Sequence, residues 1–348
     1  MDKNQVTGLI LISLLLFAYY YFFAPKTQPV ETEDPPTEII RDEPAVAATD
    51  SLVRGTPAEA PGEIQENTPI TGEYGPFTSV LKGQEEEIEI ENDLVKFTFS
   101  TRGGTIKRVL LKEFKTYDQN PLILIDEHSS TILQEINTEY GTIDLNDLYY
   151  ETGTSGTRVQ GEDTLSLSFT ATLGNGDRVI KTYRIPGNSY VVLHDMSLGE
   201  IRDEMMAPDL LFSWKNDLKQ FEKDLKTSQM KATINYYTPS DGFDDLSETS
   251  TDFEEEVIDM PVKWIAFKQK FFTSAIVSHE TFRNAYVSLN PGNLEPGVVK
   301  SCLIRTTISA DDLEKGIEYY FGPNNYQILK KVDEGFARNI YLGWTPVN

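Results

Sequence analysis

The sequence has very few residues that could form covalent cross-links or bind a metal. Cys302 is its single cysteine, so a disulfide within the chain and a zinc site of the usual thiolate type are both excluded. The three histidines, His128, His194 and His279, are far apart and form no ligand pair at short spacing. Cys302 lies in the stretch 298–304, which predicts a strand, and a lone cysteine is most often a small buried side chain.

Basic residues are also scarce. The chain has 55 Asp and Glu against 31 Lys and Arg, a net charge of -24. Binding to nucleic acid is driven by Lys and Arg facing phosphates, so this charge argues against a nucleic acid partner. It would also keep most of the surface away from anionic lipid. The 39% of hydrophobic residues are enough for a sizeable core in a chain of this length.

The motifs of common catalytic sites are missing as well. The sequence contains no phosphate-binding glycine loop, no zinc-binding histidine pair and no nucleophile elbow. His194 alternates with apolar neighbours in a predicted strand, so its side chain is expected in the core. The chain is therefore predicted not to be an enzyme and to have no catalytic, cofactor-binding or metal-binding residues.

Two acidic segments, 241–245 and 252–256, come closest to a metal site. Clustered carboxylates can bind calcium, but their spacing here differs from that of the EF-hand loop. Because runs of one charge usually lie in water, both segments are expected to be solvated acidic loops.

The N-terminus carries one long uncharged apolar run. A helix over residues 6–24 would be about 28 Å long, close to the ~30 Å hydrocarbon thickness of a bilayer. The aromatic residues at 19–23 are typical of the water interface, and Lys3 places residues 1–5 in the cytoplasm with the rest of the chain exported. A cleaved signal peptide is the alternative, but bulky residues crowd the exit of the run where cleavage requires small ones, so an uncleaved anchor is favoured.

Residues 25–83 predict a disordered, acidic linker. Nine prolines lie between Pro25 and Pro76, and Asp and Glu are frequent. Prolines remove hydrogen-bond donors, like charges repel, and few large apolar residues are available to offset the entropy of ordering.

Residues 84–308 predict a large β-sandwich. Apolar and polar residues alternate around Ile88, Phe97 and again in 105–111, 165–173 and 190–198, the period of half-buried strands. Turn signals such as Gly103-Gly104 separate these runs at the spacing of antiparallel sheets. Strands do not alternate with long helices, so a parallel α/β sheet is disfavoured.

Residues 309–348 predict short helices. Ser309 precedes acidic residues, and Leu313, Ile317 and Tyr320 fall on one face of a first helix that Gly322-Pro323 ends. Asn324 or Asn325 could cap a second helix, whose apolar residues repeat at helical spacing: Tyr326, Leu329, Val332, Phe336 and Ile340. The first helix is expected to pack on the sandwich, and the second either to pack there or to lead toward the membrane.

Four stretches, in this order along the chain, resemble YidC-type membrane protein insertases of Gram-negative bacteria, particularly those of Bacteroidetes. The first 12 residues are similar to the charged tip and first span of that family, and 91–112, with Gly103-Gly104, resembles the first strands of its periplasmic domain. The stretch 263–275 is similar to a second hallmark of that domain, and 320–344 resembles the region leading into the insertase core.

This resemblance implies a sandwich of the galactose-mutarotase type that assists insertion and folding of integral membrane proteins, alone or with the secretion channel. Nascent membrane proteins and secretion channel subunits would be its partners, and the inner membrane, with the main domain periplasmic, its location. The family inserts proteins through five further transmembrane helices that follow this domain. These 348 residues do not contain them, so the chain resembles the N-terminal portion of an insertase, and this portion alone is not expected to insert substrates.

Two other functions and one candidate site remain open. An anchored carbohydrate-binding or carbohydrate-modifying domain would use aromatic faces beside carboxylates, and a purely structural envelope protein would need no site. Between Trp264 and Phe272 four aromatic rings are either core residues or a surface where a partner docks: Trp264, Phe267, Phe271 and Phe272.

Overall fold

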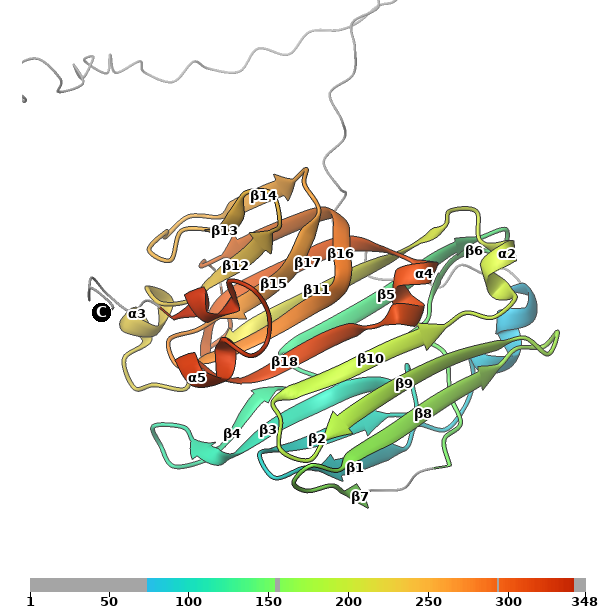
Figure 1. Ribbon diagram of the computed structural model, residues 1–348, viewed down its shortest axis with the longest axis horizontal. Coiled ribbons are helices and arrows are strands. Elements are labelled where there is room, and N and C mark those ends of the chain that lie inside the picture. The colour runs from blue at the N-terminus through green and yellow to red at the C-terminus, as the bar shows by residue number, and fades with distance from the viewer. Residues whose placement is uncertain (1–73, 154–156, 293, 341–348) are drawn as a thin grey trace, which may run out of the picture. The chain divides into compact units, whose positions relative to one another are not determined.

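The computed structural model describes residues 74–153, 157–292 and 294–340, and Figure 1 shows how their strands are arranged. The predicted membrane span at 6–24, most of the predicted linker and residues 341–348 lie outside these ranges. Within them, no helix is long and apolar enough to cross a membrane.

Two sheets build the fold (Figure 1). The smaller has five strands, in the order β4 (Pro121–Ile125), β3 (Thr105–Lys115), β2 (Val95–Ser100), β1 (Glu87–Glu91) and β7 (Thr157–Arg158). The described strands pair antiparallel, except that β1 and β7 are parallel. The prediction of mainly antiparallel β-structure is confirmed.

The larger sheet has thirteen strands. Nine of them follow one another in the order β6 (Gly141–Asp144), β5 (Ser130–Thr138), β11 (Asp209–Lys219), β17 (Val298–Ser309), β16 (Phe272–Asn290), β18 (Ile317–Pro323), β10 (Val191–Ser197), β9 (Arg178–Pro186) and β8 (Thr164–Thr172). Four more strands extend it beside β16, namely β12 (Thr233–Thr238), β13 (Gly242–Asp245), β14 (Glu254–Ile258) and β15 (Val262–Lys268). Two short helices, α2 (Ile201–Glu204) and α3 (Leu225–Gln229), lie in its connections.

The core lies between the two sheets and follows the alternation of the sequence. On β1, Ile88 and Ile90 are buried while Glu87 and Glu89 are exposed, because successive side chains of a strand point to opposite faces. Across the sheets, the ring centroids of Phe99 and Tyr183 are 4.9 Å apart. The strands predicted from alternation at 87–111, 165–173 and 190–198 are confirmed.

A buried lysine also joins the two sheets. Lys181 Nζ, on β9, donates hydrogen bonds to the Gly103 carbonyl oxygen at 2.7 Å, to Gln134 Oε1 at 2.6 Å and to Asn146 Oδ1 at 2.6 Å. Gly103 lies in the turn between β2 and β3 with φ +84°, a conformation that glycine adopts without strain. When Lys181 is protonated, each of the three ammonium protons has an acceptor.

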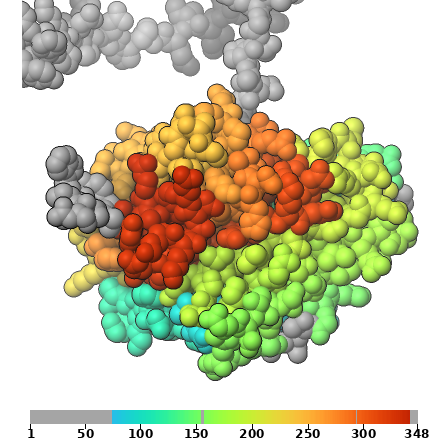
Figure 2. Space-filling model, viewed as in Figure 1, coloured from blue at the N-terminus to red at the C-terminus, as the bar shows by residue number. Residues whose placement is uncertain are grey.

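The prediction that the first helix runs from Ser309 to Gly322-Pro323 is wrong for its second half. Helix α4 (Ala310–Lys315) begins at Ser309, whose hydroxyl accepts from the Asp312 N–H, and contacts β10 and β17 as predicted. Gly316 then adopts φ 95° and ends the helix, so Ile317–Pro323 forms β18 in the larger sheet. Asn325 caps α5 (Tyr326–Leu329) as predicted, but the later apolar residues do not continue it and a short 3-10 helix, η2 (Phe336–Asn339), follows. Figure 2 shows these C-terminal residues, in red, beside the teal residues of the smaller sheet.

The prediction that the linker extends to residue 83 is wrong at its end. Residues Gly75–Val80 form a 3-10 helix, η1, and Phe77 and Val80 are buried in the core. Burial of these two apolar side chains favours an ordered structure, which the proline-rich residues before them do not have the apolar side chains to form.

The two acidic segments are also not loops throughout, since β13 and β14 run through them. Two predictions about single residues agree with the structure. Cys302 is buried in β17, and His194 is buried in β10, where its ring stacks on Tyr183. Asp195 points to the other face of β10 and pairs with Arg184.

Candidate functional site

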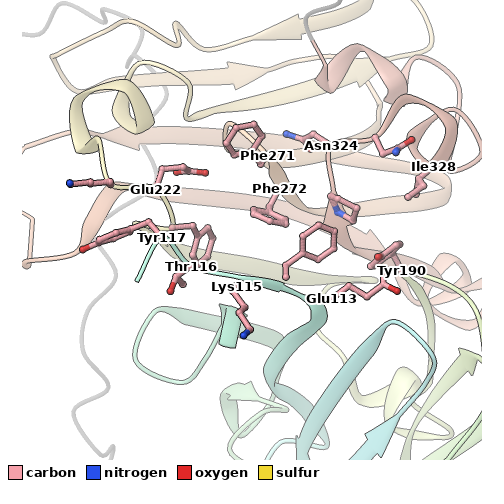
Figure 3. A pocket seen from close by; sticks show the side chains of 15 residues that line it. Glu113, Lys115, Thr116, Tyr117, Tyr190, Glu222, Phe271, Phe272, Asn324 and Ile328 are labelled. Atoms are coloured by element: carbon pink, nitrogen blue, oxygen red, sulfur yellow. The ribbon is translucent and has the colours of Figure 1, made fainter. Parts of the chain in front are cut away.

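A cleft of about 660 Å³ opens where the end of β3 in the smaller sheet meets the beginning of β16 in the larger one. It also receives residues from the loop after β11 and from the segment leading into α5. Six aromatic residues line this aromatic cleft, drawn in Figure 3: Phe114, Tyr117, Tyr190, Phe221, Phe271 and Phe272. A concave, mostly apolar site with a few polar groups is the usual form of a binding pocket.

Phe272 forms the floor of the cleft. Its ring meets the edge of Phe114 with centroids 5.2 Å apart and that of Phe221 at 5.7 Å, both with an interplanar angle of 84°. Only 6% of Phe272 is exposed, whereas 49% of the preceding Phe271 is exposed. Neighbouring side chains near a strand end point in opposite directions, so Phe272 packs inward and Phe271 stands at the rim.

Hydrogen bonds hold the segments around the cleft in place. The Tyr117 N–H donates to the Phe221 carbonyl oxygen at 2.9 Å, which ties the loop after β3 to the loop after β11. The Asn324 N–H donates to the Phe271 carbonyl oxygen at 2.7 Å. The Asn324 side chain donates to the Gln269 carbonyl oxygen, also at 2.7 Å. The cleft is therefore preformed rather than built by mobile side chains.

Charged groups of both signs surround the aromatic rings. Lys270 Nζ lies 4.8 Å from the centroid of the Phe271 ring, a cation–π contact. Glu113, Lys115, Glu222 and Lys223 also line the cleft. Burial, with a smaller effect from the Glu113 charge, raises the pKa of Tyr190, so this phenol stays neutral at pH 7. A ligand would find an apolar floor and a polar rim.

A second cavity of about 410 Å³ adjoins the aromatic cleft. The two share Glu113, Tyr190 and Ile328 in their walls, and the second is extended by Leu94 and Val332. Together they form an elongated groove beside α5, which suits an extended ligand better than a compact one.

The structure separates the four aromatic residues predicted as a possible docking surface. Trp264 is buried, donates its indole N–H to the Glu334 carbonyl oxygen at 2.8 Å and packs against Phe336. Phe267 is also buried, and the centroids of its ring and the Trp214 ring are 4.9 Å apart. Both are core residues away from the cleft, as the core-packing interpretation predicts, and only Phe271 and Phe272 line the cleft.

Sequence reasoning missed Phe114, Tyr117 and Phe221. Tyr117 is 53% exposed at the cleft rim, and Phe114 and Phe221 frame Phe272 from two segments far apart in the sequence. Phe114 and Tyr117, close together at the end of β3, could have indicated a site. The local sequence does not show that they lie near Phe271.

His194 and Cys302, two residues of types that often act in catalysis, lie away from the aromatic cleft. Burial lowers the pKa of His194 to about 3 and holds the pKa of the Cys302 thiol well above its usual range, and neither residue lines the cleft. Among the described residues, no group of three His, Cys, Asp or Glu side chains is placed to hold a metal ion.

Comparison with known families decides the assignment. A family model, the YidC periplasmic domain, matches residues 87–347. The chain belongs to this family. The YidC match takes in both sheets, the aromatic cleft and the C-terminal segment beside it.

Curated relatives agree with this assignment. The chain is 30% identical to the membrane protein insertase YidC of Amoebophilus asiaticus, over all of this chain and 56% of that protein. It is also 30% identical to the insertase YidC of Cytophaga hutchinsonii, again over all of this chain and 56% of the relative. The chain thus spans about half the length of the YidC relatives it matches.

Similar solved structures include a galactose mutarotase-like protein from Lactobacillus casei, with 10% identity and a TM-score of 0.42 over 68% of this chain and all of that one. A GalM/aldose epimerase homologue from C. elegans has 10% identity and a TM-score of 0.35 over 69% of this chain and 99% of that one. The finer assignment of a galactose-mutarotase-type sandwich stays a prediction.

Proposed function

We propose that this chain is the periplasmic part of a membrane protein insertase, anchored by residues 6–24 in the inner membrane with its N-terminus in the cytoplasm. In this proposal residues 1–5 form the cytoplasmic tip, 25–73 tether the domain, and the domain assists insertion and folding of integral membrane proteins, alone or with the secretion channel. The observation that carries the proposal is the similarity of the whole chain to proteins named membrane protein insertase.

The aromatic cleft is the surface through which the domain would contact a protein partner. Tyr117 and Phe271 keep about half of their surfaces exposed there, and exposed aromatic residues around a concave site are typical of binding surfaces. The adjoining cavity lengthens the site, so an extended apolar segment of a nascent membrane protein, or of a secretion channel subunit, fits it best.

One observation favours a second function, binding of a carbohydrate. Glu113 and Glu222 line the cleft together with Tyr117 and Phe271, and carboxylates beside aromatic faces also suit sugars. Trp214 and Trp264, whose large aromatic faces could also stack on a sugar, are buried in the core.

A photo-crosslinking amino acid at position 271 tests the first proposal. In cells that make the chain, we expect crosslinks from the cleft to membrane proteins during synthesis or to secretion channel subunits. The variant Phe271→Asp should lose noncovalent association with these proteins. The matched control is Phe253→Asp, because Phe253 is an exposed phenylalanine outside the cleft.

Two results would count against the proposal. One is equal association of the Phe271→Asp and Phe253→Asp variants with membrane proteins. The other is saturable binding of periplasmic glycans that Phe271→Asp abolishes and Phe253→Asp keeps, which would establish the carbohydrate function instead.

A further inference from the structure

Strand β8 is an outer strand of the larger sheet, as Figure 1 shows at the edge beside β9. It pairs with β9 at nine successive positions, from Thr164 opposite Pro186 to Thr172 opposite Arg178, without a register shift. Its sequence has no charged residue and no proline. One side of this long, regular strand is therefore occupied by β9, and the other is the edge of the sheet.

The contact of β8 with Glu151 identifies which backbone groups face outward. The Thr170 N–H donates to the Glu151 carbonyl oxygen at 2.9 Å, and the Glu151 N–H donates to the Thr170 carbonyl oxygen at 2.9 Å. The N–H and C=O of one strand residue point to the same side and alternate along the strand. Thr164, Ser166 and Ser168 therefore direct theirs to the edge, where no other described residue makes a backbone hydrogen bond to them.

The other outer strands carry the features that normally block an edge. Short length, charged side chains, proline and irregular pairing all hinder the addition of another strand. β14 contains Glu254, Glu255 and Glu256, and β13 ends with Asp244 and Asp245. β4 begins with Pro121 and pairs with register shifts, while β6 and β7 have four and two residues. β8 has none of these features.

We propose that the outer edge of β8 binds an extended segment of another protein, which adds to the larger sheet as a further strand beside Thr164, Ser166 and Ser168. Backbone groups that face outward in a row, and that pair with no other described residue, are satisfied best by a second strand, a common form of peptide recognition. This surface differs from the aromatic cleft, and the inference does not rest on the proposed insertase function.

The charge around the edge indicates which segments fit. Three exposed acidic residues lie next to β8, Glu151, Glu162 and Asp163, against one exposed basic residue, Arg178, opposite Thr172, and the whole chain carries a charge of -24. A strand flanked by Lys or Arg is therefore attracted, whereas a second copy of this chain is repelled.

Amide hydrogen exchange of the full chain tests this proposal. The probe is a short peptide of alternating threonine and valine with a lysine at each end. At a peptide concentration about ten times its Kd, we expect the Ser166 and Ser168 amides to exchange about tenfold more slowly, because exchange then requires release of the peptide. The Leu165 and Leu167 amides, which face β9, should not change.

Two variants separate edge binding from stability. Ser166→Pro removes an N–H that points away from β9, so it should abolish the protection of Ser168 while leaving the thermal midpoint near that of the parent. Ser166→Val keeps the N–H and is the matched control. If Ser166→Pro does not fold, Ser168→Lys keeps the backbone intact and should weaken binding of the lysine-ended peptide by like-charge repulsion.

Three results would overturn the proposal. The first is the absence of protection at any peptide concentration. The second is equal protection by a peptide with glutamate at both ends, which would remove the preference for basic segments. The third is protection of Ser166 and Ser168 without peptide that increases with chain concentration, which would make the occupant a second copy.

Discussion

Phe114 and Phe272 come from different sheets and meet edge to face, with ring centroids 5.2 Å apart. This contact joins β3 to the start of β16, and it forms the floor of the aromatic cleft. Phe272 thus belongs to both the core and the candidate site, while its neighbour Phe271 belongs to the site alone. The difference allows stability and binding to be tested separately.

Replacing Phe272 by alanine should destabilise the domain strongly. The buried ring packs between Phe114 and Phe221, and truncation of such a ring typically costs about 3–5 kcal/mol. Phe271→Ala, the control at the exposed neighbouring position, should change the free energy of unfolding by about 0.5 kcal/mol or less. Urea unfolding followed by tryptophan fluorescence measures both. Similar losses in the two variants would contradict this account of the cleft floor.

Lys181 should make stability depend on pH above neutrality. Burial lowers the pKa of Lys181 from its usual 10.5 to about 7. Between these values the unfolded chain binds the proton more completely than the folded chain, so stability rises as pH rises from about 7 to about 10. The slope is at most about 1.4 kcal/mol per pH unit.

The Lys181→Met variant isolates this contribution. It should lack the extra slope, and it should be less stable by about 2–3 kcal/mol because three buried acceptors lose their donor. Unfolding free energies at pH 7, 8 and 9 for parent and variant provide the measurement. Parallel pH profiles would show that Lys181 keeps its proton throughout.

Gly103→Ala should cost more than Gly176→Ala. Both glycines have positive φ, +84° and +96°, a conformation that costs other residues about 1–2 kcal/mol. An added Cβ at Gly103 would lie 2.8 Å from the Asn146 carbonyl oxygen, whereas at Gly176 it would meet nothing within 4 Å. We expect a total loss of at least about 2 kcal/mol at Gly103, seen as a lower thermal midpoint. Equal effects would mean that the turn moves freely to relieve the contact.

The Cys302 thiol should be unreactive in the folded chain. It is buried in β17, and burial raises its pKa, so both access and thiolate formation are suppressed. Iodoacetamide should label it slowly in buffer and rapidly in urea, with mass spectrometry as the readout. Cys302→Ala, which removes the single thiol, controls for reaction at other groups. Rapid labelling in buffer would show that the region around β17 opens often.

Part of this structure could be predicted from the sequence because its strands are half-buried. Ile88, Phe97 and Leu167 alternate with polar residues, and this period identifies a strand wherever one face is buried. The same reasoning failed at Ile317 and Tyr320, whose spacing fits a helix although Ile317, Tyr319 and Phe321 also alternate. Neighbouring strands β16 and β10 decide between the two, and neighbours are not visible in a local pattern.

The aromatic cleft could be predicted only in part. Phe271 and Phe272 stood out as an aromatic pair, but their partners Phe114 and Phe221 lie far away in the sequence and on other strands or loops. Phe77 was missed for a related reason, because one aromatic residue after many prolines has no period. Long-range packing, rather than local propensity, placed all of these residues.

Strand β16 prevents the domain from separating into two stable parts. Its first half pairs with β15 and β18, and its second half pairs with β14 and β17. Asn284, with φ 51°, lies between the halves, yet the strand continues through it. Proteases cut where a segment can detach from the rest. The strands that pair with the first part of β16 cannot separate from those that pair with its second part unless β16 itself unfolds. Digestion of the domain should therefore proceed from intact chain directly to small peptides, without a stable intermediate fragment.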